Sequence, residues 1–137
     1  MLLLMSNMTC ATELSSVPPE LKLAVGQEWS IKSSPASATR IVIGRIEPWR
    51  DKVVVHVSIL NVVISANPTM TVSEIAHAPF EESALARSLD QMTATSRSPS
   101  SQFESGYAQW KEQHGGIYTV TVSEMISLAI QTLNQHQ

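Results

Sequence analysis

The sequence is short of the features that most often reveal a function or a compartment. It has one cysteine among 137 residues, so no internal disulfide can form, and a chain of this length can bury a core without one. No stretch approaches the ~20 consecutive apolar residues that a transmembrane helix requires. We therefore expect a soluble chain with no membrane span.

Export and compartment are only weakly indicated. The apolar start, Met1–Met5, has no preceding Lys or Arg and is too short for the core of a signal peptide. A lone cysteine fits a reducing cytoplasm, which is slightly favoured, and also a periplasmic protein without disulfides. We interpret residues 1–20, which include Pro18–Pro19, as an N-terminal arm or leader remnant, and residues 21–137 as one domain.

An excess of positive charge is also absent. Nine basic residues stand against twelve acidic ones, giving a net charge of −3 and no field that would attract a phosphate backbone. Residues 1–68 carry six basic and five acidic side chains, whereas residues 69–137 carry three and seven. These counts argue against nucleic acid as a partner and leave an acidic half that could oppose a basic protein.

What is present is a clear change of periodicity along the chain. Up to about residue 64 apolar side chains alternate with polar ones, which is the period of a half-buried strand. This alternation predicts strands over residues 28–32, 40–47 and 52–59, the third continuing through 62–64, and a fourth over 69–75. A turn is predicted at Pro48–Asp51, between the second strand and the third.

The second of these strands contains a glycine. Alternation places Ile41 and Ile43 on one side of the strand and Val42 and Ile46 on the other. We expect Gly44 to mark a bulge or the close approach of another element, because glycine weakens a strand and brings no side chain to pack.

After Pro79 the period becomes that of a helix. Leu85, Leu89 and Met92 recur at helical spacing and predict an amphipathic helix over residues 80–94.

Two further helices are predicted from capping boxes, in which a Ser or Thr and a Glu three residues later each satisfy a free backbone donor. The pairs are Ser101 with Glu104 and Thr121 with Glu124. Gly115–Gly116 is expected to end the first of these two helices.

Sequential strands joined by short turns favour an antiparallel meander. We therefore predict an α+β fold, in which an N-terminal antiparallel meander of three or four strands packs one face against three C-terminal helices. The predicted core consists of apolar residues on the inward faces of these elements: Trp29, Ile31, Ile41, Ile43, Val53, Val55, Val57, Leu85, Leu89, Phe103, Tyr107, Trp110, Leu128 and Leu133.

No catalytic constellation is recognisable. Cys10, the only thiol, lies in the arm, outside any scaffold that could lower its pKa. The histidines are His56, His77, His114 and His136, and none lies three or four residues from another, as two metal ligands on one helix face would. We therefore predict no catalytic residue, no metal site and no cofactor.

Candidate binding residues fall in two places. His77 lies where the sheet gives way to the helices, and it either lines a pocket together with Arg45 and Glu74 or bonds a loop carbonyl as a structural residue. Trp49, followed by Arg50 in the predicted turn, is either an exposed interface anchor or a cover for one edge of the sheet.

Several short strings resemble a group of small bacterial proteins with no assigned activity. They are Val25–Trp29, Arg40–Glu47, Ala76–Phe80, Gly106–Trp110 and Gly115–Gly116, and the likeness spans most of residues 21–135. The resemblance implies a small bacterial domain with its strands first and its helices last. It implies no catalytic residues.

Three functional hypotheses follow. The leading one is a non-enzymatic module that binds another protein, for example as an inhibitor or immunity protein for a bacterial toxin; it rests on the lack of a catalytic constellation and on the acidic second half. The second is a small-molecule binder or minor enzyme with a pocket between sheet and helices. The third is a structural module that self-associates through an exposed strand edge.

Overall fold

The computed structural model describes residues 22–32, 38–65 and 71–135 and, within these ranges, the side chains other than those of 63–65, 71–72 and 133–135. The predicted arm with Cys10, the side chain of Leu133 and all of His136 lie outside the described residues.

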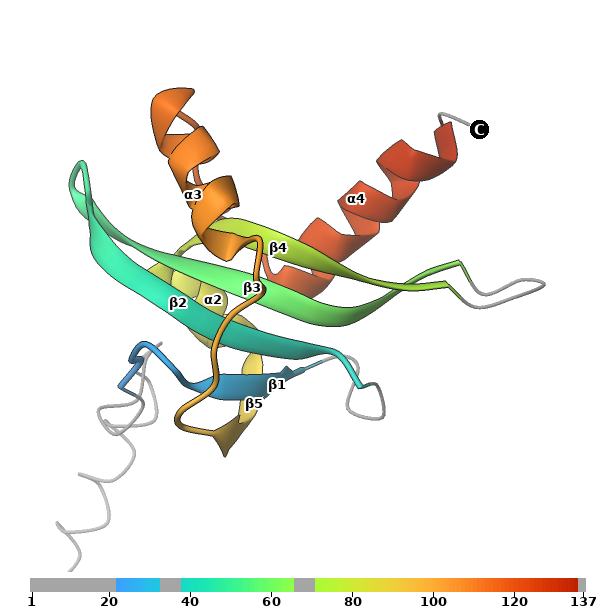
Figure 1. Ribbon diagram of the computed structural model, residues 1–137, viewed down its shortest axis with the longest axis horizontal. Coiled ribbons are helices and arrows are strands. Elements are labelled where there is room, and N and C mark those ends of the chain that lie inside the picture. Colours follow the sequence, from blue (N-terminus) through green and yellow to red (C-terminus); the bar gives the residue numbers. More distant parts are fainter. Residues whose placement is uncertain (1–21, 33–37, 66–70, 136–137) are drawn as a thin grey trace, which may run out of the picture.

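Within these ranges, five strands form one antiparallel sheet in the order β4-β3-β2-β1-β5 (Figure 1). Four of them follow one another as a meander: β1 (Glu28–Ile31), β2 (Arg40–Trp49), β3 (Lys52–Ser65) and β4 (Thr71–Glu81). The fifth, β5 (Leu89–Ala94), comes later in the chain and pairs with β1. The described helices are α2 (Glu82–Ser88), α3 (Phe103–Glu112) and α4 (Val122–Gln135). The predicted α+β class, with an N-terminal meander and C-terminal helices, is confirmed.

One face of the sheet is packed by aliphatic side chains, and we call it the aliphatic face. Leu85 of α2 and Val122 and Met125 of α4 pack there against inward-facing residues of the strands, namely Ile41, Ile43, Val55, Val57, Ile59, Ala78 and Phe80. All of these side chains are at least nine-tenths buried. Their burial is the main hydrophobic contribution to stability.

The opposite face is covered by α3, and we call it the α3 face. The neighbouring residues of the same strands point to it, among them Val42, Val54 and His56, which are fully buried. In Figure 1 the chain that leads into α3 crosses in front of β2 and β3, whereas α2 lies behind them. The expectation that all three helices share one face is therefore wrong, because the second face also carries apolar residues that need cover.

Gly44 is both a bulge and a point of close approach, as the sequence predicted. The pairing of β2 with β3 shifts between Ile43 and Arg45. A Cβ on Gly44 would lie 2.5 Å from Cζ of Phe103, so only glycine lets this ring lie on the strand. The bulge also reverses the alternation, so that Ile46 packs with the aliphatic core instead of sharing the side of Val42, where it was expected.

The predicted helix over residues 80–94 is shorter than expected. β4 runs on to Glu81, α2 occupies Glu82–Ser88, and the rest of the segment is β5. The backbone of this last part pairs with β1, whose edge would otherwise leave its polar groups without partners. Tertiary pairing therefore overrides the helical spacing, and Met92 at its end is 46% exposed.

Of the two predicted capping boxes, one forms. The N–H of Thr121 donates to Oε1 of Glu124, and the N–H of Glu124 donates to Oγ1 of Thr121. The predicted box at Ser101 and Glu104 is wrong, because α3 begins one residue later than it requires, with Gln102 as its N-cap and no side-chain cap. Ser100 replaces it, since its carbonyl accepts from Phe103 and its Oγ from Gln102.

Most of the predicted core residues are buried. Val53 and Trp110 are only half-buried, and Leu128 is 54% exposed because α4 turns Val122 and Met125 toward the sheet instead. In the part of the chain that the structure describes, no helix is both long and apolar enough to cross a membrane.

Candidate functional site

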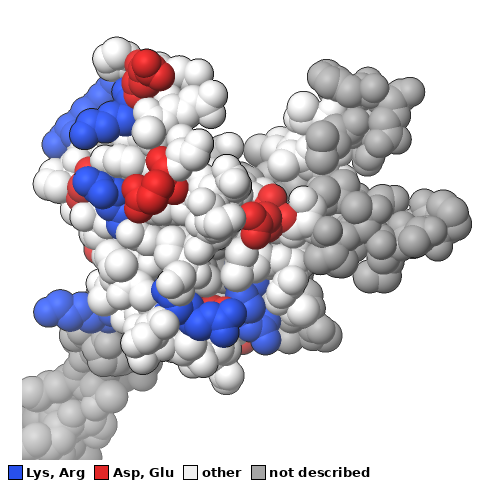
Figure 2. All heavy atoms as spheres, in the orientation of Figure 1, with Lys and Arg blue, Asp and Glu red and all other residues white. Residues whose placement is uncertain are grey.

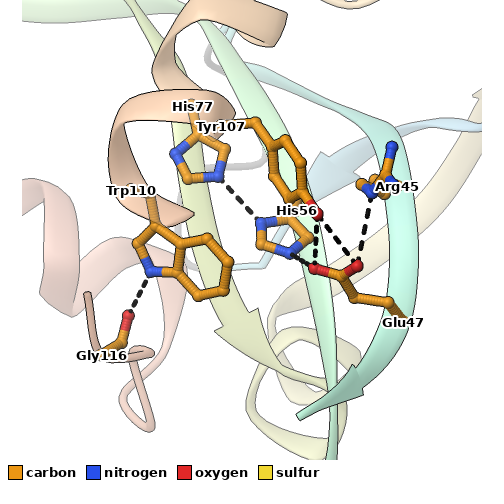
Figure 3. A network of polar contacts seen from close by, with 7 residues as sticks. All are labelled: Arg45, Glu47, His56, His77, Tyr107, Trp110 and Gly116. Carbon is orange, nitrogen blue, oxygen red and sulfur yellow. Dashed lines mark hydrogen bonds and ion pairs between the residues drawn. The ribbon is translucent and has the colours of Figure 1, made fainter. Parts of the chain in front are cut away.

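A cluster of polar and aromatic side chains lies between the sheet and α3 (Figure 3). We call it the histidine cluster. It consists of Arg45 and Glu47 from β2, His56 from β3, His77 from β4, and Tyr107 and Trp110 from α3.

Three of these side chains form one hydrogen-bonded chain. Nε2 of His56 lies 2.9 Å from Oε2 of Glu47, and Nδ1 of His56 lies 2.8 Å from Nε2 of His77. The two imidazole rings are stacked, with their centroids 5.0 Å apart. His56 is fully buried and therefore uses both ring nitrogens within the protein.

The carboxylate determines which ring nitrogens carry protons. An ionised Glu47 can only accept, so Nε2–H of His56 donates to it. In neutral His56 the remaining nitrogen, Nδ1, is then an acceptor, and Nε2–H of His77 donates to it. Neutral His77 is left with an unprotonated Nδ1, which points away from His56 (Figure 3).

Glu47 is held by three donors. Besides His56, the hydroxyl of Tyr107 donates to its carboxylate, with O···O distances of 3.0 and 3.1 Å, and Nε–H of Arg45 donates over 3.4 Å. Burial opposes ionisation of Glu47, but the hydrogen bonds from His56 and Tyr107 outweigh it, so the pKa of this carboxyl lies below its usual value. Glu47 is therefore an ionised, fixed acceptor at neutral pH.

Both histidines are held in the neutral form. Burial lowers the pKa of His56, and the adjacent Glu47 carboxylate only partly opposes this. Burial also lowers the pKa of His77, to about 4, with a contribution from the charge on His56. A proton that reaches the pair therefore settles on His56, next to the carboxylate.

Two aromatic rings from α3 cover the chain. Tyr107 and Trp110 meet the ring of His56 edge-on, with centroids 4.9 and 4.7 Å away. The guanidinium of Arg45 lies 4.4 Å from the centroid of the Tyr107 ring, in cation–π geometry. The rings exclude water from His56, which accounts for its burial and its neutrality.

Beyond Trp110 the chain folds back under the indole. α3 ends at Glu112, and His114 adopts a left-handed backbone with φ of 54°, while the N–H of Gly115 donates to the carbonyl of Trp110. The left-handed position that glycine usually takes is thus occupied by His114, one residue before the expected Gly115. Gly115 is needed for a different reason, because a Cβ there would lie 2.4 Å from Cδ1 of Trp110.

An open groove of about 620 Å³ runs beside the cluster. His77 lines it from β4, Gly106 and Trp110 line it from α3, and residues 115–118 form part of its wall. Among the described residues, Nδ1 of His77 has no hydrogen-bond partner, and every buried side-chain nitrogen or oxygen has one. Nδ1 is therefore accessible to solvent, in a residue that lines the groove.

Gly106 lets α3 pack closely against His77. A Cβ on Gly106 would lie 2.7 Å from Cβ of His77, closer than such atoms approach in proteins. Any larger residue at this position would push the helix away from β4 or displace the imidazole. The helix can therefore rest directly on His77.

The local sequence explains how β2 and β3 bring their polar residues together. The two-residue turn Arg50–Asp51, with Arg50 at φ of 57°, pairs Trp49 with Lys52 and sets the register of the hairpin. That register places Arg45 opposite His56, just before the bulge at Gly44. The bulge also turns Arg45 and Glu47 to the α3 face, whereas unbroken alternation would have turned them to the aliphatic core.

Of the predicted binding residues, the structure brings together His77 and Arg45. Glu74, proposed as their companion, lies elsewhere and accepts a hydrogen bond from Oγ of Ser100. Trp49 ends β2 and is half-buried, with the guanidinium of Arg50 4.4 Å from its ring centroid. The pair lies near the hairpin turn and, among the described residues, makes no hydrogen bond or ring contact with the histidine cluster.

The sequence reasoning missed Glu47, His56, Tyr107 and Trp110 as members of one site. A signal for the first two was present, because a two-residue turn at 50–51 would have placed His56 opposite Arg45. The broader turn that was predicted left the register open. Tyr107 and Trp110 were assigned to the core from their helical spacing, and that spacing cannot tell an aliphatic neighbour from a histidine.

Charge and metal ligands do not suggest another site. Figure 2 shows acidic and basic side chains side by side over one face of the molecule, with uncharged surface between them. Among the described residues, no group of three or more His, Cys, Asp or Glu side chains is arranged to hold a metal ion.

No protein-family model, curated protein or solved structure matches the chain.

Proposed function

We propose that the groove binds a small molecule and that the Glu47–His56–His77 chain accepts a proton from it at Nδ1 of His77. The observation that carries this proposal is that the two ring nitrogens of His77 have different environments. One ring nitrogen is bonded to a buried histidine, and the other is unpartnered in a residue that lines the groove.

The proton has a defined path. A ligand N–H or O–H would donate to Nδ1 of His77, and the proton on Nε2 would then pass to Nδ1 of His56. His56 would carry the positive charge beside the Glu47 carboxylate, and the ligand would keep the electron pair of the bond that lost its proton. A carboxylate that orients a histidine and stabilises its protonated form is the arrangement of a general base.

The free-energy cost of burying polar side chains in the histidine cluster supports a functional interpretation of the cluster. Burying a polar group costs free energy unless each of its hydrogen bonds is replaced, and apolar residues could cover α3 without that cost. The aliphatic face of the same sheet is packed in that way. Burial of His56 keeps the pair neutral, while the adjacent Glu47 carboxylate supplies the stabilisation that a proton on His56 would need.

The other two hypotheses stay predictions. A protein-binding module of the inhibitor or immunity type would use Trp49 and Arg50, which stack on each other near the hairpin turn. Self-association would use β5, an edge strand whose side chains are mostly exposed.

Nuclear magnetic resonance of the histidine ring nitrogens tests the proposed function. The full chain, labelled with ¹⁵N-histidine, would be screened against a library of small polar molecules, and binding would be followed at Nδ1 of His77. We expect hits that shift this resonance and raise the melting temperature. His77→Gln removes the resonance itself and should abolish the rise in melting temperature, whereas His114→Asn, at an exposed histidine with a left-handed backbone, should preserve both effects.

A second variant separates a functional chain from a merely structural one. Glu47→Gln keeps the shape of the side chain but removes the charge that stabilises protonated His56, so His56 should become harder to protonate in a ring-nitrogen titration. Hits that bind His77→Gln as well as the wild type would refute the proposal. A library that yields no shift at His77 would also refute it.

A further inference from the structure

The walls of the groove indicate the class of its ligand. Gln109 on α3 and Gln113, the C-cap residue four positions later, both line the groove, so the two residues lie on the same side of the helix. Trp110 and Tyr118 contribute aromatic side chains, and the second of these is 39% exposed.

The same lining contains no ionised side chain. None of its described residues is Asp, Glu, Lys or Arg, and its histidine is neutral. A charged ligand would lose part of its hydration on entering and would find no counter-ion in the lining. The groove therefore favours an uncharged molecule.

His77 requires the ligand to carry a hydrogen-bond donor. The Glu47–His56 pair fixes the proton of His77 on Nε2, so that Nδ1 can only accept. A ligand that bonds it must present an N–H or O–H. The glutamine amides, by contrast, offer both a donor and an acceptor, and they can complement a ligand group that does the same.

The flat walls and the volume of the groove indicate the shape and size of its ligand. Indole and phenol rings pack best against planar molecules, and Gly115 and Gly116 bring backbone without side chains to the groove. A volume of about 620 Å³ falls in the range of sites for small ligands.

Resting on the proposed function, we propose that the ligand is an uncharged, planar ring compound that carries an amide or lactam group. Its N–H donates to Nδ1 of His77, its carbonyl accepts from a glutamine amide, and its ring lies against the aromatic wall.

Four simple probes test the ligand class on the intact chain. They are benzamide, benzoate, N,N-dimethylbenzamide and cyclohexanecarboxamide, each titrated while the His77 ring nitrogens and the tryptophan fluorescence are followed. We expect benzamide to bind at least about tenfold more tightly than benzoate, which is charged, and than the dimethyl amide, which lacks the N–H, because a site built to pair with a donor rejects analogues without one. The non-planar amide should fall between.

Two variants, one on α3 and one at its C-cap, and a control locate the contact. Gln113→Lys places a cation in the groove and should reverse the preference, so that benzoate binds more tightly than benzamide. Gln109→Leu should weaken benzamide by about three- to tenfold, because the replacement keeps bulk but loses the amide. Gln131→Ala, at an exposed glutamine of α4, should change nothing.

The outcomes separate the ligand class from the proposed function. Equal or tighter binding of benzoate to the wild type, with a shift at His77, would overturn the ligand class and leave the groove and its base in place. Binding of benzamide that leaves His77 unshifted would overturn it as well. Failure of these probes together with the whole library to shift His77 would remove both proposals.

Discussion

The two faces of one sheet are packed by different chemistry, although alternate residues of the same strands supply both. On the aliphatic face Val55, Val57 and Ile59 meet Leu85 and other apolar side chains. On the α3 face the residues between them are buried to the same degree but include His56 and Ser58. Depth of burial therefore does not distinguish the two faces, whereas polarity does.

The two faces make different contributions to the protein. Apolar burial is favourable wherever it occurs, at roughly 25 cal/mol per Å² of area removed from water, so the aliphatic face stabilises the fold without further conditions. A polar interior is stable only when its hydrogen bonds are complete, and among the described residues no buried side-chain nitrogen or oxygen lacks a partner. The contribution of the α3 face is therefore the fixed geometry of the histidine cluster.

The largest expected effect is on the aliphatic face. Leu85 is fully buried, and Leu85→Ala should lower the free energy of unfolding by about 2–5 kcal/mol through lost burial and the cavity left behind. Leu128→Ala is the matched control, because Leu128 is 54% exposed and its truncation should change stability by less than about 0.5 kcal/mol.

Urea denaturation would measure both changes in stability. The ring resonances of His77 in folded Leu85→Ala should match those of the wild type, since the two faces are packed independently. A shift of these resonances as large as that caused by Gly106→Ala, which crowds His77 directly, would show that the faces are not independent.

The next effect belongs to the α3 face and depends on pH. The pKa of His77 is lowered to about 4 in the folded protein, against about 6.5 when unfolded, so the unfolded state binds more protons between these values. Stability that is complete above pH 6.5 should therefore fall as the pH drops toward 4. One pKa unit corresponds to about 1.4 kcal/mol, and partial solvent access reduces the full value, so we expect a loss of about 1–2 kcal/mol.

The measurement is the difference between two proteins, which removes the contributions of other groups. The free energies of unfolding of the wild type and His77→Gln, measured from pH 4 to 7.5, should converge at low pH. Only the wild type loses stability through protonation of this ring in the unfolded state. His56 faces His77 and also has a lowered pKa, while Glu47 and Arg45 lie at the far end of the chain. Parallel curves would show that His77 is protonated as readily in the folded protein as in the unfolded one.

Much of the fold could be predicted, because it follows from local pattern. The dense β-branched run at 53–57 became part of β3, which pairs with β2 and β4, and Gly44 became the bulge and close approach that its position indicated. The helix over 80–94 failed because the free edge of β1 captured its second half, and nothing local shows where a distant edge needs a partner. Leu85 and Leu89, whose spacing suggested the helix, are both buried, but Leu89 belongs to β5.

The candidate site was predictable only in fragments. His77 and Arg45 were recognised one at a time, but their connection runs through His56 and Glu47, and it depends on a one-residue bulge and a two-residue turn. Such a register cannot be read from composition or spacing, since one step along the strand moves every side chain to the other face. Tyr107, whose hydroxyl donates to Glu47, comes from a helix sixty residues away.

The smallest expected effect concerns the N-terminal caps of α4 and α3, one helix from each face. α4, on the aliphatic face, begins with a formed capping box, so Thr121→Ala should cost about 1 kcal/mol by leaving backbone donors of the first turn without a partner. Ser101→Ala is the matched change in α3, where the same sequence motif forms no box, and it should cost less than about 0.3 kcal/mol because Ser100 and Gln102 already provide the start of that helix. Thermal and urea unfolding of the two variants would be compared with the wild type. Equal losses would mean that the predicted box at Ser101 and Glu104 forms in solution after all, and that α3 begins earlier than Phe103.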